Sequence, residues 1–280
     1  WLLSKQTKTV GDWIISSPGA EPGGWYFQFE NELFPDVDDS AVVLMALAKV
    51  RLPDEEQQRL AIRRGCRWVT AMQGSDGGWG AYDVDNNRIV FNYIPFADHR
   101  ALLDPSTADL AGRCLEMLAT LGYDWTHPSV ASALTFVKND QEQDGSWYGR
   151  WGVNYIYGTW SVLSGLRAIG EDLSSPYIRR AVSWVESKQN PDGGWGESCL
   201  SYADVAESGR GDSTPSQTAW ALLALMAGGV TDSFSLARGI HYLIRNQRKD
   251  GSWEEVRHTG TGLPRVFYLR YHWYCQYFPL

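Results

Sequence analysis

The chain has 280 residues, which is enough to bury one large hydrophobic core or two modest ones. Its 25 basic and 33 acidic residues give a formal net charge of −8 without any basic run, so we expect no nucleic acid among its partners. No apolar run is long enough to span a membrane, and neither the four cysteines nor the five histidines are spaced like metal ligands, so we expect no metal site.

A glutamine that is followed by a loop glycine and a tryptophan recurs five times along the chain. The occurrences cover residues 6–13, 73–79, 141–147, 189–195 and 247–253, and the last four share the form Q-x3-G-x-W. A repeat of this kind predicts an architecture of repeated helical units. We interpret each glutamine as a donor to free backbone groups at neighbouring helix ends, with the tryptophan packed over it as a structural residue.

Three carboxylates stand directly before a long apolar stretch. Asp36, Asp38 and Asp39 precede residues 41–50, which are apolar almost all round and predict a buried helix. In one interpretation these acids have a structural role alone: Asp36 is the N-cap of this helix, and Asp39 is its partner in a capping arrangement. In the other interpretation, burial and the helix dipole act on the three acids and prepare them for proton transfer.

Helical segments of two kinds alternate after each repeat. Residues 60–73, 130–141, 177–189 and 236–247 predict amphipathic helices, and residues 108–121, 157–169, 217–227 and 267–278 predict more apolar ones. With a first helix that ends near residue 6 and its partner after Asp36, the count is five outer and five inner helices. We therefore predict an all-α fold, a single α/α toroid over residues 1–280, which lacks two helices of a ring of six hairpins and belongs to a longer protein or is closed by residues outside this chain.

Aromatic residues are frequent in the segments between the repeats. Phe267, Tyr271 and Tyr274 are spaced four and three residues apart, so we expect them on one face of the helix predicted over residues 267–278. Such a stripe is either part of the core or part of a wall of aromatic rings that lines a cavity.

Several long segments together resemble one family, the squalene-hopene cyclases. They are FPDVDDSAVVLMAL (34–47), GGWGAYDVDNN (77–87), DGSWYGRWGVNYIYGTW (144–160), NPDGGWGE (190–197) and STPSQTAWALLAL (213–225). The Q-x3-G-x-W repeats are part of the same resemblance. The chain looks like the acid-bearing carboxy-terminal barrel of a two-barrel enzyme. The resemblance implies protonation-initiated cyclisation of squalene to hopene or hopanol without metal or other cofactor.

The same resemblance implies the partners and the location of the protein. They are the squalene substrate, an amino-terminal barrel, a second copy in a homodimer, and the membrane surface at the cytoplasmic face of a bacterium, on which the protein would rest without a spanning helix.

The resemblance also implies roles for individual residues. Asp38 would be the proton donor, with Asp36 and Asp39 sharing its hydrogen bonds and charge. Arg113 occupies a position where some members have histidine, and its role would be electrostatic because an arginine cannot relay a proton. Asp109 and Tyr157 would belong to the network that reprotonates the acid.

The substrate cavity would be lined mainly by aromatic residues that stabilise carbocations through their ring faces. The residues implied are Phe27, Tyr82, Phe96, Trp151, Leu263, Phe267, Tyr271 and Tyr274. Leu263 departs from the family pattern, which commonly has phenylalanine there, so the late cation would lack one ring face.

Three alternatives remain open from the sequence. A class II cyclase of a prenyl diphosphate would share the Asp-x-Asp-Asp motif, although it would need a basic pocket and usually magnesium. An α/α-barrel glycoside hydrolase would use tryptophan platforms and a pair of carboxylates. The isolated chain could also be a non-catalytic structural module, and we expect it to be inactive alone.

Overall fold

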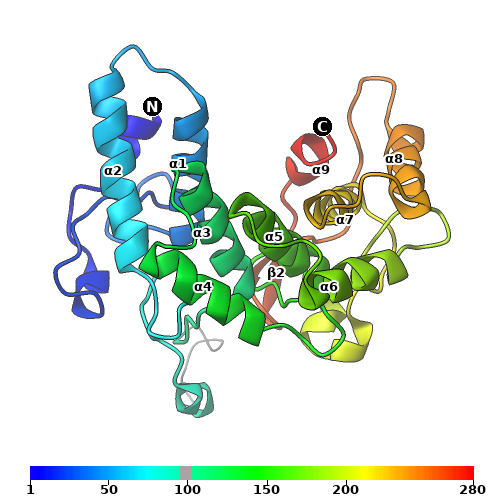
Figure 1. Cartoon of the computed structure of the whole chain (residues 1–280), viewed down its shortest axis with the longest axis horizontal. Helices are drawn as coiled ribbons and strands as arrows, with labels where there is room; N and C mark the ends of the chain where they lie inside the picture. Colours follow the sequence, from blue (N-terminus) through cyan, green and yellow to red (C-terminus); the bar gives the residue numbers. More distant parts are fainter. Residues whose placement is uncertain (95–101) are drawn as a thin grey trace. The chain divides into compact units, whose positions relative to one another are not determined.

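The computed structural model of the chain describes residues 1–94 and 102–280, and Figure 1 shows that helices predominate. Phe96 lies outside the described residues. The described helices include none that is long and apolar enough to cross a membrane.

The described chain forms two compact units. The first comprises residues 1–139 and 168–170, and the second comprises residues 140–167 and 171–280. The first contains α1 (Val37–Lys49), α2 (Glu55–Ala71), α3 (Ala108–Thr120), α4 (Pro128–Asn139) and three short 3-10 helices, η1 (Leu2–Lys5), η2 (Asp12–Ile15) and η3 (Ile89–Tyr93).

The second unit contains four longer helices and a small sheet. Its helices are α5 (Tyr155–Ala168), α6 (Pro176–Ser187), α7 (Pro215–Ala227), α8 (Phe234–Asn246) and the single turn α9 (Tyr274–Tyr277), with the 3-10 helices η5 (Cys199–Tyr202) and η6 (Val205–Glu207). Strands β1 (Gly260–Leu263) and β2 (Phe267–Leu269) pair in antiparallel register, with Gly260 opposite Leu269.

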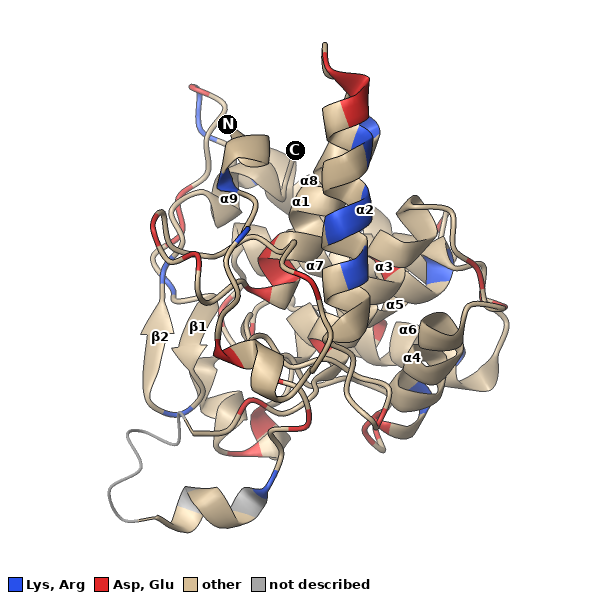
Figure 2. Cartoon of the chain, turned by 90° about the vertical axis from the view of Figure 1, so that its left-hand side faces the viewer, with Lys and Arg blue, Asp and Glu red and all other residues tan. Residues whose placement is uncertain are grey.

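The predicted alternation of two helix types is confirmed by burial. In α7 eleven of the thirteen residues are buried, whereas α8 of the same length buries only Gly239, Tyr242 and Leu243. Figure 2 shows the exposed face of α2 lined by basic residues, with Glu55 and Glu56 at the amino-terminal end, where the helix dipole favours negative charge.

The prediction of a helix over residues 267–278 is wrong. Residues 267–269 form β2 instead, and only Tyr274–Tyr277 are helical, so Phe267, Tyr271 and Tyr274 do not share a helix face. Glycines in β1 explain the difference, because a Cβ on Gly262 would lie 1.9 Å from the Phe267 ring and one on Gly260 would lie 2.3 Å from the Tyr271 ring. The rings therefore pack directly on the backbone of β1, an arrangement that period-based reasoning does not detect.

The helix expected to end near residue 6 is also shorter than predicted, since only the 3-10 turn η1 precedes Gln6. Residues 1–94 and 102–280 thus contain eight α-helices of twelve or more residues in place of the ten that the repeat count suggested.

The predicted role of the repeated glutamines is confirmed. The Nε2 of Gln73 donates to the carbonyl of Gly77 at 2.8 Å and to that of Ser129, at the start of α4, at 2.9 Å. Equivalent pairs of bonds join Gln141 to Gly145 and Tyr177, and Gln189 to Gly193 and Ser235. Each of these three glutamines therefore links the loop after its own helix to the first turn of the next amphipathic helix.

The tryptophans of the repeats fix the other side of the same loops. The indole nitrogens of Trp79, Trp195 and Trp253 each donate to the carbonyl of the residue ten positions earlier, at 2.7, 2.7 and 2.9 Å. The loops can turn so tightly because a glycine with a positive φ angle, +94° at Gly193, precedes each tryptophan by two residues.

Candidate active site

The acidic motif lies at the start of α1, in the first compact unit. Asp36 is the N-cap residue, and its Oδ1 accepts a hydrogen bond from the backbone nitrogen of Asp39 at 3.0 Å. Its own backbone nitrogen donates to the carbonyl of Trp25 at 2.7 Å. The capping interpretation of Asp36 is therefore confirmed, and it does not exclude a chemical role because the side chain is also buried.

The loop after the second repeat joins the starts of α1 and α3. The backbone nitrogen of Val37 donates to the carbonyl of Ala81 at 2.9 Å, and that of Thr107 donates to the carbonyl of Trp79 at 3.1 Å. Tyr82 follows in this loop, and its hydroxyl is hydrogen-bonded to the Asp36 carboxylate. The structure thus brings the predicted cavity residue Tyr82 to the acid itself.

Burial and crowding make two of the three acids hold protons strongly. Burial, followed by the charges of Asp39 and Asp38, raises the pKa of Asp36 well above its ordinary value, against the opposing hydrogen bonds from the Asp39 amide and Tyr82. Burial and the charge of Asp38 raise the pKa of Asp39 to about 7. Since these acids are coupled, the protons belong to the cluster rather than to single side chains.

Asp38 differs from its two neighbours in its partner. Its Oδ1 accepts a hydrogen bond from the Nε of Arg113 on α3 at 3.1 Å. The Asp38 side chain is 27% exposed, whereas Asp36 is buried, so Asp38 is more accessible than Asp36. Arg113 is itself only 11% exposed and has Glu116 as a second, more distant partner at 3.9 Å.

Asp109 lies in the first turn of α3, one helical turn before Arg113. It is 2% exposed and accepts hydrogen bonds from the Thr107 hydroxyl at 2.5 Å and from the backbone nitrogen of Leu110 at 3.0 Å. The structure therefore places this predicted network residue as a buried carboxylate on the same helix as Arg113.

Tyr157 lies in the second compact unit, within a cluster of aromatic rings. Its ring centroid is 5.0 Å from that of Trp220 and 5.5 Å from that of Trp160, and the two indoles are nearly parallel at 6.0 Å. Tyr274 packs against Trp220 at 5.7 Å and against Tyr271 at 4.6 Å. The cluster thus joins three of the predicted residues, Tyr157, Tyr271 and Tyr274.

Sequence reasoning missed Trp160 and Trp220, which lie at the centre of this cluster. The available signal was their position inside two strongly apolar helices, α5 and α7, each of which buries eleven residues.

The other predicted cavity residues are more dispersed. Phe27 is 57% exposed, and Phe267 in β2 is 48% exposed and lies opposite Leu263 in the sheet register. Trp151 is partly buried, with the Arg150 guanidinium 5.3 Å from its ring centroid.

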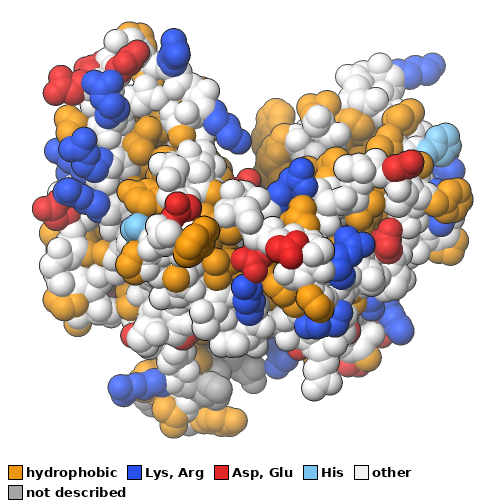
Figure 3. All heavy atoms as spheres, in the orientation of Figure 1, with side chains coloured by type: hydrophobic (Ala, Val, Ile, Leu, Met, Phe, Trp, Pro, Cys, Tyr) orange, Lys and Arg blue, Asp and Glu red, His pale blue; other side chains and the backbone are white. Residues whose placement is uncertain are grey.

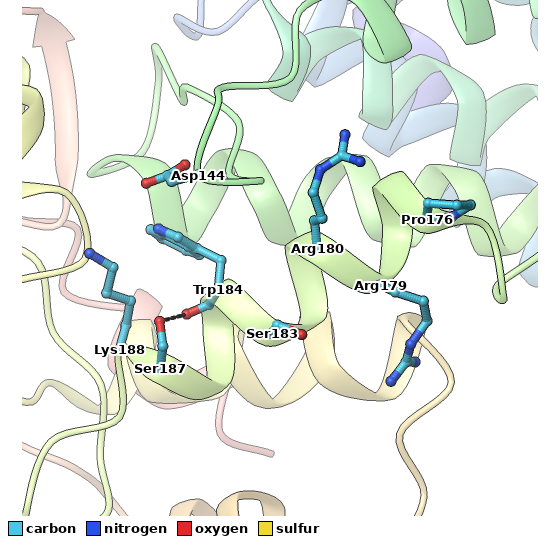
Figure 4. A pocket seen from close by; sticks show the side chains of 8 residues that line it. All are labelled: Asp144, Pro176, Arg179, Arg180, Ser183, Trp184, Ser187 and Lys188. Carbon is cyan, nitrogen blue, oxygen red and sulfur yellow. Dashed lines mark hydrogen bonds between the residues drawn. The ribbon is translucent and has the colours of Figure 1, made fainter.

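Two surface grooves are found in the second unit. One groove has a volume of about 580 Å³ and runs along α6. Figure 4 shows its lining side chains, which include Arg179, Arg180 and Lys188. These cations donate to the carbonyl of Gly228, to Gln141 Oε1 and to the carbonyl of Ser208, respectively, so they serve the packing of the unit.

The other groove has a volume of about 420 Å³ and is apolar, lined by α7, α8 and the last residues of the chain. Figure 3 shows apolar side chains at the surface in the region of α8. Within residues 1–94 and 102–280, no group of three or more His, Cys, Asp and Glu side chains is arranged to hold a metal ion.

The helical fold agrees with comparisons to known proteins. The family described as "Squalene-hopene cyclase C-terminal domain" matches residues 1–280, and the chain belongs to this family.

Three curated relatives are similar to this chain over its whole length. The squalene–hopene cyclase of Alicyclobacillus acidocaldarius is 55% identical over 279 residues, which cover 44% of that protein, and the one of Zymomonas mobilis is 49% identical over 286 residues, which cover 43%. Dammaradiene synthase of Dryopteris crassirhizoma is 45% identical over 303 residues, 44% of its length. The chain therefore spans less than half the length of these relatives.

Among solved structures, the type II terpene cyclase MstE from Scytonema has a similar fold. Its TM-score is 0.59 at 18% sequence identity, and the match covers 87% of this chain and 64% of that one.

Proposed function

We propose that the chain is the acid-bearing domain of a squalene-hopene cyclase and protonates a terminal double bond of squalene. The observation that carries this proposal is the cluster at the start of α1, where three carboxyls meet the Arg113 guanidinium and the Tyr82 hydroxyl. Family membership and 55% identity to a squalene–hopene cyclase support the choice of substrate.

Protonating an alkene requires a donor that is neutral before the reaction and stabilised as an anion after it. Asp38 fits this role because it is more accessible than Asp36 and because Arg113 stabilises its carboxylate. The raised pKa values of Asp36 and Asp39 keep protons in the cluster near neutral pH.

In the reaction, the O–H bond of Asp38 breaks and the π electrons of the terminal alkene form a C–H bond with that proton. The adjacent carbon becomes a cation, which the next double bonds attack in turn to close the rings. Loss of a proton from the last cation gives hopene, and capture of water gives hopanol. Asp109 and Tyr157 are proposed to help return a proton to the acid.

The cationic intermediates are proposed to be stabilised by ring faces, each contributing roughly 0.5–2 kcal/mol. The cluster around Trp220 offers such faces in Tyr157, Tyr271 and Tyr274. We propose Phe27, Tyr82, Trp151 and Phe267 as further substrate-contacting residues, and Leu263 as one that offers bulk without a ring face.

At the level of the whole protein, we propose a single α/α toroid that pairs with an amino-terminal barrel. The alternation of buried and amphipathic helices supports it. We further propose a homodimer that rests on the cytoplasmic membrane surface of a bacterium, from which squalene is drawn.

The test replaces Asp38 by asparagine in the complete protein and measures squalene turnover by gas chromatography of the products. We expect Asp38→Asn to lower turnover by roughly 100- to 10,000-fold, the usual contribution of a general acid. Asp54→Asn is the matched control, because Asp54 caps α2 as Asp36 caps α1 but is exposed.

Full turnover by Asp38→Asn would contradict the assignment of the acid. Turnover of a prenyl diphosphate without turnover of squalene would contradict the substrate.

A further inference from the structure

Asp104, which the sequence did not single out, binds the main chain of the loop that carries Tyr82. Its carboxylate is buried, with the residue 8% exposed. Oδ2 accepts hydrogen bonds from the backbone nitrogen of Tyr82 at 2.6 Å and from that of Asp83 at 2.9 Å. A single carboxylate oxygen therefore fixes two consecutive peptide groups.

Further contacts hold Asp104 and this loop together. The backbone nitrogen of Asp104 donates to the carbonyl of Asn86 at 3.1 Å, and Asn86 Nδ2 donates to the carbonyl of Leu102 at 2.9 Å. A Cβ on Gly80 would lie 2.8 Å from Asp104 Oδ2, so the loop backbone passes directly against the carboxylate. The position of Tyr82 is thus determined by Asp104 through the main chain.

The side chain of Tyr82 reaches the acid from this fixed backbone. Its hydroxyl is hydrogen-bonded to Asp36. The residues next to this pair are also joined, because the backbone nitrogen of Val37 donates to the carbonyl of Ala81. The titratable and charged groups around Asp36 are Asp38 and Asp39 from α1, Tyr82 from the loop, and Arg113 and Cys114 from α3.

We propose that Asp104 is a positioning residue for the catalytic acid: it holds the Tyr82 hydroxyl on Asp36 and thereby helps to set which carboxyl of the cluster carries the proton. A hydrogen bond donated by Tyr82 stabilises the ionised form of Asp36. When Tyr82 is displaced, the ionised form of Asp36 loses this hydrogen bond, so Asp36 should hold its proton more strongly. This inference rests on the proposed function of Asp38.

The principal experiment is a double-mutant cycle on squalene turnover in the complete protein. We expect Tyr82→Phe and Asp104→Ala each to lower kcat, by roughly 10–100-fold as is typical for residues that orient a reacting group, with little change in KM. Because Asp104 acts through Tyr82, the double variant should match Tyr82→Phe to within roughly a factor of two. Losses that multiply in the double variant would overturn the proposal, since they indicate an independent structural role.

Two further variants distinguish the effect of losing the Asp104 acceptor oxygen from a general disturbance of the loop. Asp104→Asn retains an oxygen that can accept both amide hydrogens, so it should recover most of kcat. Asp83→Asn is the matched control, because the Asp83 carboxylate accepts from Asn86 Nδ2 and holds no backbone amide of Tyr82. A loss in Asp83→Asn equal to that in Asp104→Ala would also contradict the proposal.

A readout without substrate separates this inference from the proposed function. The infrared carbonyl band of protonated carboxyls should change in the same direction in Tyr82→Phe and Asp104→Ala, and stay unchanged in Asp83→Asn. A change in Tyr82→Phe alone would overturn the positioning role, whether or not the protein cyclises squalene. If Asp104→Ala does not fold, Asp104→Ser, whose hydroxyl is too short to reach both amides, takes its place in every comparison.

Discussion

Asp39 shows how burial and a neighbouring charge keep an acid protonated at the start of a helix. It lies in the first turn of α1, where the helix dipole alone would favour its ionised form. Burial and the neighbouring charge of Asp38 outweigh that effect and raise its pKa to about 7. The local environment of this one side chain therefore lets the cluster hold a proton near neutral pH.

The raised pKa of Asp39 predicts a loss of stability as the pH rises. Between its ordinary value of 3.8 and about 7, the folded protein holds a proton that the unfolded chain has released. The free energy of unfolding should therefore fall with rising pH across this interval, with a contribution from Asp39 that approaches about 1.4 kcal/mol per pH unit. Asp39→Asn should remove this contribution, as measured by urea denaturation at several pH values.

Asp54→Asn is the control for this measurement, since Asp54 is an exposed helix cap. If the stability difference between the native protein and Asp39→Asn were the same at about pH 5 and about pH 8, the assignment of the raised pKa to Asp39 would be wrong.

At the scale of elements, the residue two positions after Trp79, Trp195 or Trp253 meets the start of a buried helix. Glu197 Oε2 accepts from the backbone nitrogen of Ile156 at the start of α5, and Glu255 Oε2 accepts from that of Ser216 at the start of α7. At the start of α1 the equivalent residue is Ala81, which offers only its carbonyl. The carboxylates at this helix start come from the helix itself, which leaves room for Tyr82.

Ala81→Glu tests this comparison between elements. Ala81 is 1% exposed, so glutamate there would place a fourth carboxyl beside Asp36, Asp38 and Asp39. We expect it to abolish turnover and to destabilise the protein at neutral pH by roughly 2 kcal/mol more than Ala81→Gln, which has the same size without the charge. The difference should shrink in acid, and equal effects of the two variants in chemical denaturation would show that bulk rather than charge is responsible.

The repeated glutamines should differ in what they contribute to stability. Gln189 makes two hydrogen bonds from a partly buried position, whereas the exposed Gln247 donates to the carbonyl of Gly251. We expect Gln189→Ala to lower the free energy of unfolding by about 1–3 kcal/mol and Gln247→Ala by about 1 kcal/mol or less. Urea denaturation midpoints measure both, and a larger cost for Gln247→Ala would contradict the role assigned to the bond across to α8.

The same elements show what the sequence could and could not predict. Periodicity located α2 to α8 to within a few residues because each buries one stripe or nearly its whole surface. It failed at residues 267–278, where ring packing on Gly260 and Gly262 decides the backbone. In the site, Asp36 and Arg113 were identifiable from motifs, whereas Asp104 was not, because its role depends on main-chain contacts over twenty residues away in sequence.

At the scale of the whole molecule, the chain spans less than half the length of its curated relatives. A carbocation survives only where water is excluded. We therefore expect residues 1–280 alone to form no hopene or hopanol from squalene in detergent, although the acid cluster is complete within them. Gas chromatography of the products decides this, and formation of hopene by the isolated chain would contradict the expectation.

The bonds from the repeat tryptophans have a consequence for how this protein can vary in length. The indole of Trp195 donates to the carbonyl of Val185, ten positions earlier, so the number of residues in the stretch between donor and acceptor is fixed by this bond. One inserted residue within the helical part of that stretch would turn the indole by about 100° around the axis and remove it from its acceptor. A change of length inside any of the three stretches that end at Trp79, Trp195 and Trp253 should therefore break this bond, whereas a change outside them leaves it in place.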